Sequence, residues 1–203
     1  MEINEALKSE ILKEYLNDDY LEKENLENIK KVLFKNSPKS IMLEDFFKKE
    51  KYYMLKEEIR RLKFKRKYFP DKLSFNQGEI GKNFKKLIQS EELKTVFEFL
   101  LGKKINDFKT NSIMLKHKDY SLLSDNGPEV SGFLINFFFN DLWKEEYGGY
   151  FSFVSENAEV LRLMSKENCV SIVYVDKTVD WFIKYINVNS NKRQIYFSKT
   201  IIL

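Results

Sequence analysis

The sequence predicts an α+β protein in which helices come first and short β-strands follow, packed as a sandwich or jelly roll. Two observations predict this class. Up to Gly102, apolar residues recur mainly at helical spacing, whereas after it they form short runs separated by turn residues. The chain also holds 18 Phe and 11 Tyr among 203 residues, and aromatic side chains favour the pleated, half-buried surface of a sheet.

Residues 1–35 are predicted to be helical, because two apolar stripes run along them at helical spacing. Asn and Asp at positions 17–19 should separate two helices, since these side chains compete for local backbone hydrogen bonds. Ser37-Pro38 should end the helical region. These helices either support the sheet or mediate self-association as a homodimer, and support is the favoured role. The stripes comprise Leu7, Ile11, Leu12, Leu16 and Leu26, Ile29, Val32, Leu33.

The middle of the chain is predicted to hold one strand and further helices. A short strand is expected in residues 40–47 (SIMLEDFF), followed by a helix over residues 49–62. Another helical segment should cover residues 81–101 and end at Gly102, because glycine commonly terminates helices. Ser90 is placed to cap a restart within that segment.

The strands are predicted after Gly102, and turn residues separate them. No internal repeat, low-complexity segment or linker interrupts the sequence. We therefore expect one domain over residues 1–203, with a helical N-terminal extension over 1–37 and the remainder over 38–203. The predicted strands are residues 112–115, 132–139, 150–154, 160–163, 170–175, 181–188 and 194–203.

Composition argues against nucleic acid and membranes as partners. Charged residues make up 33% of the chain, but the formal net charge is only +4. The most basic stretch, residues 63–67 (KFKRK), is followed by Tyr68 and Phe69. Bases could stack on such aromatics, but a solvated face with its aromatics turned inward is the favoured interpretation. No segment is long and apolar enough to span a bilayer.

The single cysteine, Cys169, leaves no intramolecular disulfide. It fits a reducing compartment, and we expect the protein in the cytoplasm. The thiol has no histidine near it in sequence, so we interpret it as a small buried residue rather than a nucleophile.

The chemistry-bearing stretch centres on His117, the only histidine, and on Asp119. In an extended segment these side chains would project from one face, because side chains alternate along a strand. An imidazole and a carboxylate held together in this way can take two adjacent positions around a metal ion. Without further support, His117 would be an edge histidine that hydrogen-bonds Asp119.

The surrounding pattern resembles the prolyl 4-hydroxylase-like 2-oxoglutarate- and iron(II)-dependent dioxygenases. His117-Lys118-Asp119 is followed by an apolar run that ends near Trp143, and then by Gly148-Gly149, in the order of the family's pattern. The resemblance extends upstream to SIMLEDFF, and it covers roughly residues 38–203. It implies a cupin-like double-stranded β-helix, or jelly roll, with Fe(II) and 2-oxoglutarate as cofactors.

The same resemblance implies a second histidine and, nine or ten residues later, a basic residue that holds 2-oxoglutarate. Arg193 matches the basic position, because its planar fork can pair with a carboxylate, although a surface role on a strand is the alternative. Nine residues before it stands Lys184, whose ammonium has no lone pair for a metal.

Three interpretations of this incomplete triad remain open. In the first, iron binds through His117 and Asp119, and oxygen ligands fill the other positions. In the second, Lys184 either ligates the metal or replaces its charge. In the third, the site is inactive and the fold is a binding or assembly module. The first two imply hydroxylation of an unidentified small-molecule or protein substrate. The loop between Asp119 and Ser131 would border the pocket, whereas Tyr147, Tyr150 and Tyr185 are expected to serve in packing.

Overall fold

The computed structural model describes residues 1–106, 108–122 and 131–202. Helices occupy the first part of the chain, and three of the predicted boundaries are confirmed. Asn17 caps a short 3-10 helix by accepting a hydrogen bond from the Asp19 backbone, Ser90 caps α6 in the same way, and Gly102 ends α6 with a φ of +66°. The helices are α1 (Ile3–Ala6), α2 (Glu10–Tyr15), η1 (Asp18–Leu21), α3 (Lys23–Lys35), α4 (Lys49–Arg60), α5 (Lys82–Ile88) and α6 (Glu91–Leu101).

The strands form two sheets. The large sheet has the order β1-β9-β6-β11-β4-β3-β2, with β5 paired to β3, and the small sheet has the order β10-β7-β8. Short 3-10 helices, η2 (Glu145–Tyr147) and η3 (Val188–Ser190), lie in the connections. The strands are β1 (Ser40–Leu43), β2 (Lys65–Phe69), β3 (Leu73–Gly78), β4 (Lys109–Leu115), β5 (Tyr120–Ser121), β6 (Gly132–Phe138), β7 (Phe151–Ser155), β8 (Ala158–Leu163), β9 (Cys169–Val175), β10 (Asp180–Ile183) and β11 (Ile195–Ile202).

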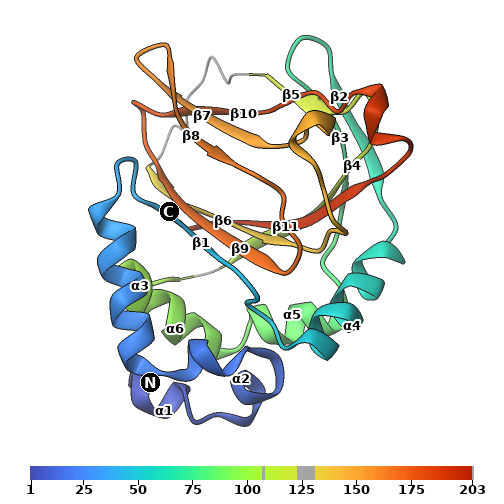
Figure 1. Ribbon diagram of the computed structural model, residues 1–203. Helices are drawn as coiled ribbons and strands as arrows, with labels where there is room; N and C mark the ends of the chain where they lie inside the picture. Colours follow the sequence, from blue (N-terminus) through green and yellow to red (C-terminus); the bar gives the residue numbers. More distant parts are fainter. Residues whose placement is uncertain (107, 123–130, 203) are drawn as a thin grey trace.

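The two sheets face each other, and the helices cover the other face of the large sheet (Figure 1). In the large sheet, β4 and β11 pair with each other, β11 pairs with β6, and β6 pairs with β9, all antiparallel. In the small sheet, β10 pairs with β7 and β7 with β8. The chain thus alternates between the sheets as a double-stranded β-helix does, and the predicted α+β class with a jelly roll is confirmed.

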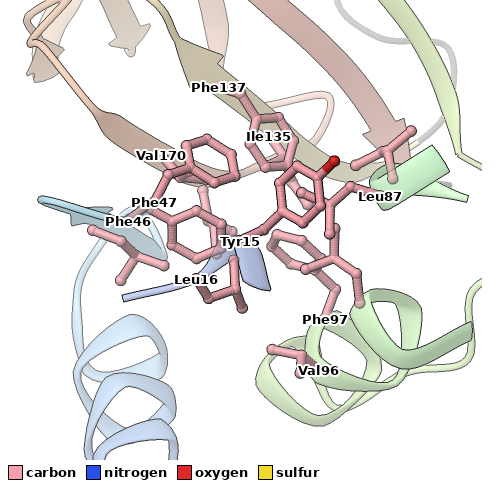
Figure 2. Packing of buried hydrophobic residues seen from close by; sticks show 14 of the residues in the cluster. Tyr15, Leu16, Phe46, Phe47, Leu87, Val96, Phe97, Ile135, Phe137 and Val170 are labelled. Atoms are coloured by element: carbon pink, nitrogen blue, oxygen red, sulfur yellow. The ribbon is translucent and has the colours of Figure 1, made fainter. Parts of the chain in front are cut away.

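The core has two parts, because the strands of the large sheet present side chains to both faces. On β6, Phe133, Ile135 and Phe137 pack against the helical layer, whereas Leu134 and Phe138 point toward the small sheet. Figure 2 shows Ile135 and Phe137 among the aromatic and aliphatic residues that join the helices to the sheet. Every residue of β6 is buried, which explains its continuous apolar sequence.

Three features differ from the sequence-based expectations. The strand predicted for residues 181–188 ends at Ile183. Strands β2, β3 and β5 were not predicted, because their sequences are polar, basic or too short to show a period of two. Tyr68 and Phe69 on β2 are 59% and 57% exposed, so these aromatics are not turned inward as expected.

Among the described residues, no helix combines the length and the apolar composition that a membrane crossing requires.

Candidate functional site

His117 and Asp119 lie in a tight turn between β4 and β5, not in an extended segment. The Asp119 N–H donates to the carbonyl of Lys116 at 2.8 Å, and Lys118 has a φ of +74°. A positive φ at the third position is the feature of a type II turn. Two backbone bonds to Ile186 hold the turn against the segment that follows β10. The segment is therefore not extended, so strand alternation does not apply to these two side chains.

Asp119 is fully buried, and its carboxylate is enclosed by hydrogen-bond donors. Oδ1 accepts from the Arg66 guanidinium in a close ion pair, and it lies 3.4 Å from the Ser74 hydroxyl. Oδ2 accepts from the Asn76 amide at 3.2 Å and from the Lys116 backbone N–H at 2.9 Å. Both oxygens are thus satisfied and the negative charge is paired, as a buried carboxylate requires.

His117 is at the tip of the turn and is half-buried. Its ring meets Tyr185 edge-on, with 6.4 Å between the ring centroids, and Tyr185 is 44% exposed, which fits packing at the rim. Among the described residues, Asp119 accepts hydrogen bonds from groups other than His117. The expected hydrogen bond between His117 and Asp119 is therefore not found there.

Lys184 follows β10 and its side chain is exposed. Ile183 points into the space between the sheets, and Lys184 follows it on the exposed side. The pKa of the nearby Glu159 is lowered mainly by a hydrogen bond from Arg162, and the charge of Lys184 adds a small part. The role of Lys184 at a metal site stays a prediction.

Arg193 precedes β11 and is also exposed. Its guanidinium donates to the Tyr147 hydroxyl at 3.3 Å and lies 5.4 Å from the centroid of that ring. Together with Arg60, Trp143 and Tyr196 it lines a cleft on the surface. The role of Arg193 in holding 2-oxoglutarate stays a prediction.

Gly148 and Gly149 join η2 to β7 with φ values of +76° and +70°. A Cβ atom on Gly148 would lie 2.0 Å from the carbonyl oxygen of Tyr185. The Trp143 indole donates to the Gly148 carbonyl at 2.8 Å. This part of the motif therefore shapes the backbone around the segment that carries Tyr185 and Ile186.

The described residues do not fit an iron ion. Across residues 1–106, 108–122 and 131–202, no three His, Cys, Asp or Glu side chains gather as metal ligands would. Asp119 is already neutralised by Arg66, and iron oxygenases of the facial-triad type need two histidines and a carboxylate with open positions. Residues 123–130, which form most of the predicted substrate loop, lie outside the described residues.

Sequence reasoning missed the residues that hold Asp119. Arg66 belongs to the basic stretch that was interpreted only as a solvated face, and Ser74 and Asn76 belong to β3, which was not predicted. A hairpin of β2 and β3 would have placed Arg66 opposite Asn76. Its turn is formed by Pro70 and Asp71, a pair that is typical of turns, but β2 has no apolar alternation that would have indicated a strand before it. Cys169 is buried as expected, and burial raises the pKa of its thiol to about 12.

Comparison with models of known protein families finds no match. The chain is 36% identical over 83 residues to the prolyl 3-hydroxylase OGFOD1 of Xenopus laevis. That match covers 38% of this chain and only 16% of the frog protein, so most of the frog protein has no counterpart here.

Solved structures with the same fold cover nearly the whole chain. A prolyl 4-hydroxylase from Pseudomonas putida gives a TM-score of 0.68 at 11% identity over 86% of this chain and 97% of its own. A Trichoplax adhaerens prolyl hydroxylase, solved with a hypoxia inducible factor peptide, gives 0.67 at 10% identity over 91% and 95%. A 2OG-Fe(II) oxygenase family oxidoreductase from Burkholderia pseudomallei gives 0.66 at 8% identity over 87% and 90%. The chain thus has the fold of the 2-oxoglutarate- and iron-dependent oxygenases, and over 38% of its length it is similar in sequence to a prolyl 3-hydroxylase.

Proposed function

We propose that this oxygenase-like protein binds a ligand within its barrel and does not carry out iron-dependent oxidation. The observation that carries the proposal is the enclosure of Asp119 by Arg66, Ser74, Asn76 and the Lys116 backbone. In this arrangement the guanidinium supplies the positive charge that a metal ion would otherwise bring to the carboxylate.

The energetic argument supports the same conclusion. To bind a metal, Asp119 would have to release Arg66, and breaking a buried ion pair costs several kcal/mol. The gain would come from one carboxylate and one histidine, because His117 is the only histidine in the chain. So few protein ligands hold a divalent ion poorly against water and competing sites.

The test is an anaerobic titration of metal-free protein with Fe(II), with and without 2-oxoglutarate, followed by the visible charge-transfer absorbance. We expect no band at any ratio while circular dichroism shows folded protein. The Pseudomonas putida prolyl 4-hydroxylase, treated in parallel, serves as the positive control. A band in this protein would refute the proposal.

A second candidate is a 2-oxoglutarate- and iron-dependent hydroxylase, favoured by the His117-x-Asp119 sequence together with the similarity to the frog prolyl 3-hydroxylase. It requires Arg66 to leave Asp119 when the metal binds. In that case the band appears and is lost in His117→Ala. Lys184→Ala and Arg193→Ala then show whether these residues serve the metal and 2-oxoglutarate, and a peptide becomes the first substrate to try.

A further inference from the structure

The excess positive charge of the chain is concentrated in one short segment. Residues 61–72 (RLKFKRKYFPDK) contain six basic residues and one acidic residue, a net charge of +5, whereas the whole chain has a net charge of +4. The rest of the chain therefore balances to within one charge. Nucleic-acid-binding proteins are marked by a basic stripe on one element rather than by their total charge. The low net charge of the whole chain thus does not exclude such a partner.

This basic segment forms β2, which ends the large sheet and forms a hairpin with β3 (Figure 1). Every residue of β2 is exposed. Because side chains alternate along a strand, Lys65, Lys67 and Phe69 share one face, whereas Arg66 and Tyr68 share the other. The guanidinium of Arg66 is already paired with a buried carboxylate. The face that carries the two lysines is therefore the one that offers positive charge to a partner.

The lysines of this segment have no counterion in the described part of the chain. The ion pairs found there do not involve Lys63, Lys65, Lys67 or Lys72. Lysines on an edge strand can serve only to discourage pairing with other chains. That role does not account for Phe69, which is 57% exposed, because a large exposed ring on an edge strand favours association.

A single-stranded nucleic acid matches both the charge and the ring. Its phosphates pair with lysines, and its bases stack on aromatic side chains whatever their sequence. Lys65, Lys67 and Phe69 follow one another at intervals of about 7 Å, because a strand rises about 3.3–3.4 Å per residue. A duplex fits less well, since its paired bases offer only their edges in the grooves. An acidic peptide supplies the charge, but its carboxylates leave the ring of Phe69 without a partner.

We propose that the face of β2 formed by Lys65, Lys67 and Phe69 binds single-stranded nucleic acid. The two lysines pair with phosphates, and a base stacks on the ring of Phe69. Lys63 before the strand and Lys72 after its turn extend the track of positive charge. The site lies on an exposed edge of the large sheet, so it is separate from the ligand binding proposed for the barrel and does not rest on it.

The test is the fluorescence anisotropy of a labelled single strand of about 12 nucleotides, titrated with the whole chain in the presence of a chelator. RNA and DNA of the same sequence are compared, at about 50 to 200 mM salt. We expect both to bind, with a slope of log affinity against log salt of about −3, because four lysines each contribute about −0.7. An unlabelled duplex of the same sequence and an oligoglutamate peptide should compete at least about tenfold more weakly.

The contribution of charge is tested with Lys65→Gln/Lys67→Gln. This double variant should bind more weakly, and its salt slope should be less steep by about 1.4, because two phosphate contacts are lost. The matched control is Lys31→Gln/Lys35→Gln, which removes two exposed lysines from α3. It should change neither the affinity nor the slope.

The contribution of the ring is tested with Phe69→Ala, which should weaken binding at least about fivefold without changing the salt slope. Phe69→Tyr keeps a ring and should bind as the wild type does. Tyr68→Ala is the matched control, because this neighbouring ring is 59% exposed but lies on the other face of β2.

Three results would overturn the inference: no binding, equal competition by the duplex or the acidic peptide, or equal losses in Phe69→Ala and Tyr68→Ala. All the variants change exposed side chains, so circular dichroism should show wild-type folding for each of them. The chelator removes iron, so these results are independent of the Fe(II) titration that tests the proposed function.

Discussion

Arg66 is predicted to be essential for the buried charge of Asp119. Removing the guanidinium in Arg66→Met leaves a fully buried carboxylate without its counterion. Losing one partner of a buried pair costs about 3–5 kcal/mol, and we expect at least about 2 kcal/mol here, because 41% of the Arg66 side chain is exposed. Urea unfolding of wild type and variant measures the loss.

The control for Arg66→Met is Lys67→Met, which removes the neighbouring exposed cation and should change stability by less than about 0.5 kcal/mol. The double variant Arg66→Met/Asp119→Asn should be more stable than Arg66→Met alone, because the unpaired charge is gone. Equal losses in Arg66→Met and Lys67→Met would show that the guanidinium does not neutralise Asp119.

At the level of single residues, the sequence identified His117 and Asp119 as the chemically important pair, but it could not show what contacts them. The side chains that contact the Asp119 carboxylate come from 43 to 53 residues earlier in the chain. Such long-range contacts follow from strand pairing, and nothing in the local pattern around Arg66 indicates a buried carboxylate. The turn at Lys118 was equally hidden, because lysine does not indicate a positive φ.

The positive backbone angles of Gly148 and Gly149 between η2 and β7 were predictable from sequence, since paired glycines favour them. The hairpin of β2 and β3 was not, because every residue of β2 is exposed and its sequence therefore lacks apolar alternation. Elements with a buried face were thus predictable, and elements held mainly by backbone pairing were not.

Gly148 is predicted to tolerate no side chain. Its φ of +76° and ψ of −152° lie in a region that is essentially restricted to glycine, and an added Cβ would collide with the Tyr185 carbonyl oxygen. Gly148→Ala should therefore cost more than about 3 kcal/mol and displace the segment beside His117. Thermal unfolding measures the cost, and the fluorescence of Trp143, which bonds to the Gly148 carbonyl, reports the displacement.

Gly102→Ala is the matched control for Gly148→Ala, because Gly102 also has a positive φ but the nearest atom to an added Cβ is 3.7 Å away. It should cost only about 1 kcal/mol, the strain of a left-handed residue at a helix end. If the two alanine variants lose the same stability, the close approach to Tyr185 is not what restricts Gly148.

The whole molecule depends on how the helical layer is fixed to the sheets. Much of this contact is apolar, as the cluster around Phe46, Phe47 and Phe137 shows (Figure 2). The sequence predicted this layering, because helices with one apolar stripe and strands with two apolar faces can be buried only against each other. It did not predict the polar contact between α4 and the strand ends.

That contact is made by Lys56 on α4, whose side chain is only 5% exposed. The ammonium pairs with Asp141 after β6 at 2.6 Å and with Glu167 before β9 at 3.4 Å. The hydrogen bond from Lys56 is the main reason that the pKa of Asp141 is lowered, and Arg60 contributes as well. A buried cation thus links the helix to two connections of the large sheet.

Lys56→Met should therefore change the pH dependence of stability more than stability at neutral pH. A carboxyl group with a lowered pKa stabilises the folded state above its unfolded pKa of about 4, and this contribution is lost as pH falls through the folded value. In Lys56→Met that contribution is smaller. At pH 7 methionine replaces the buried charge with apolar volume, so the net change is modest, about 1 kcal/mol.

The unfolding free energy of the wild type minus that of Lys56→Met should decrease as pH falls from 7 to about 3. Taking the difference matters, because Glu14, Glu98, Glu159 and Asp176 also have lowered pKa values and their effect cancels between the two proteins. Urea unfolding at stepped pH gives the curve. A difference that is constant with pH would mean that Lys56 fixes α4 to the sheet by packing rather than by charge.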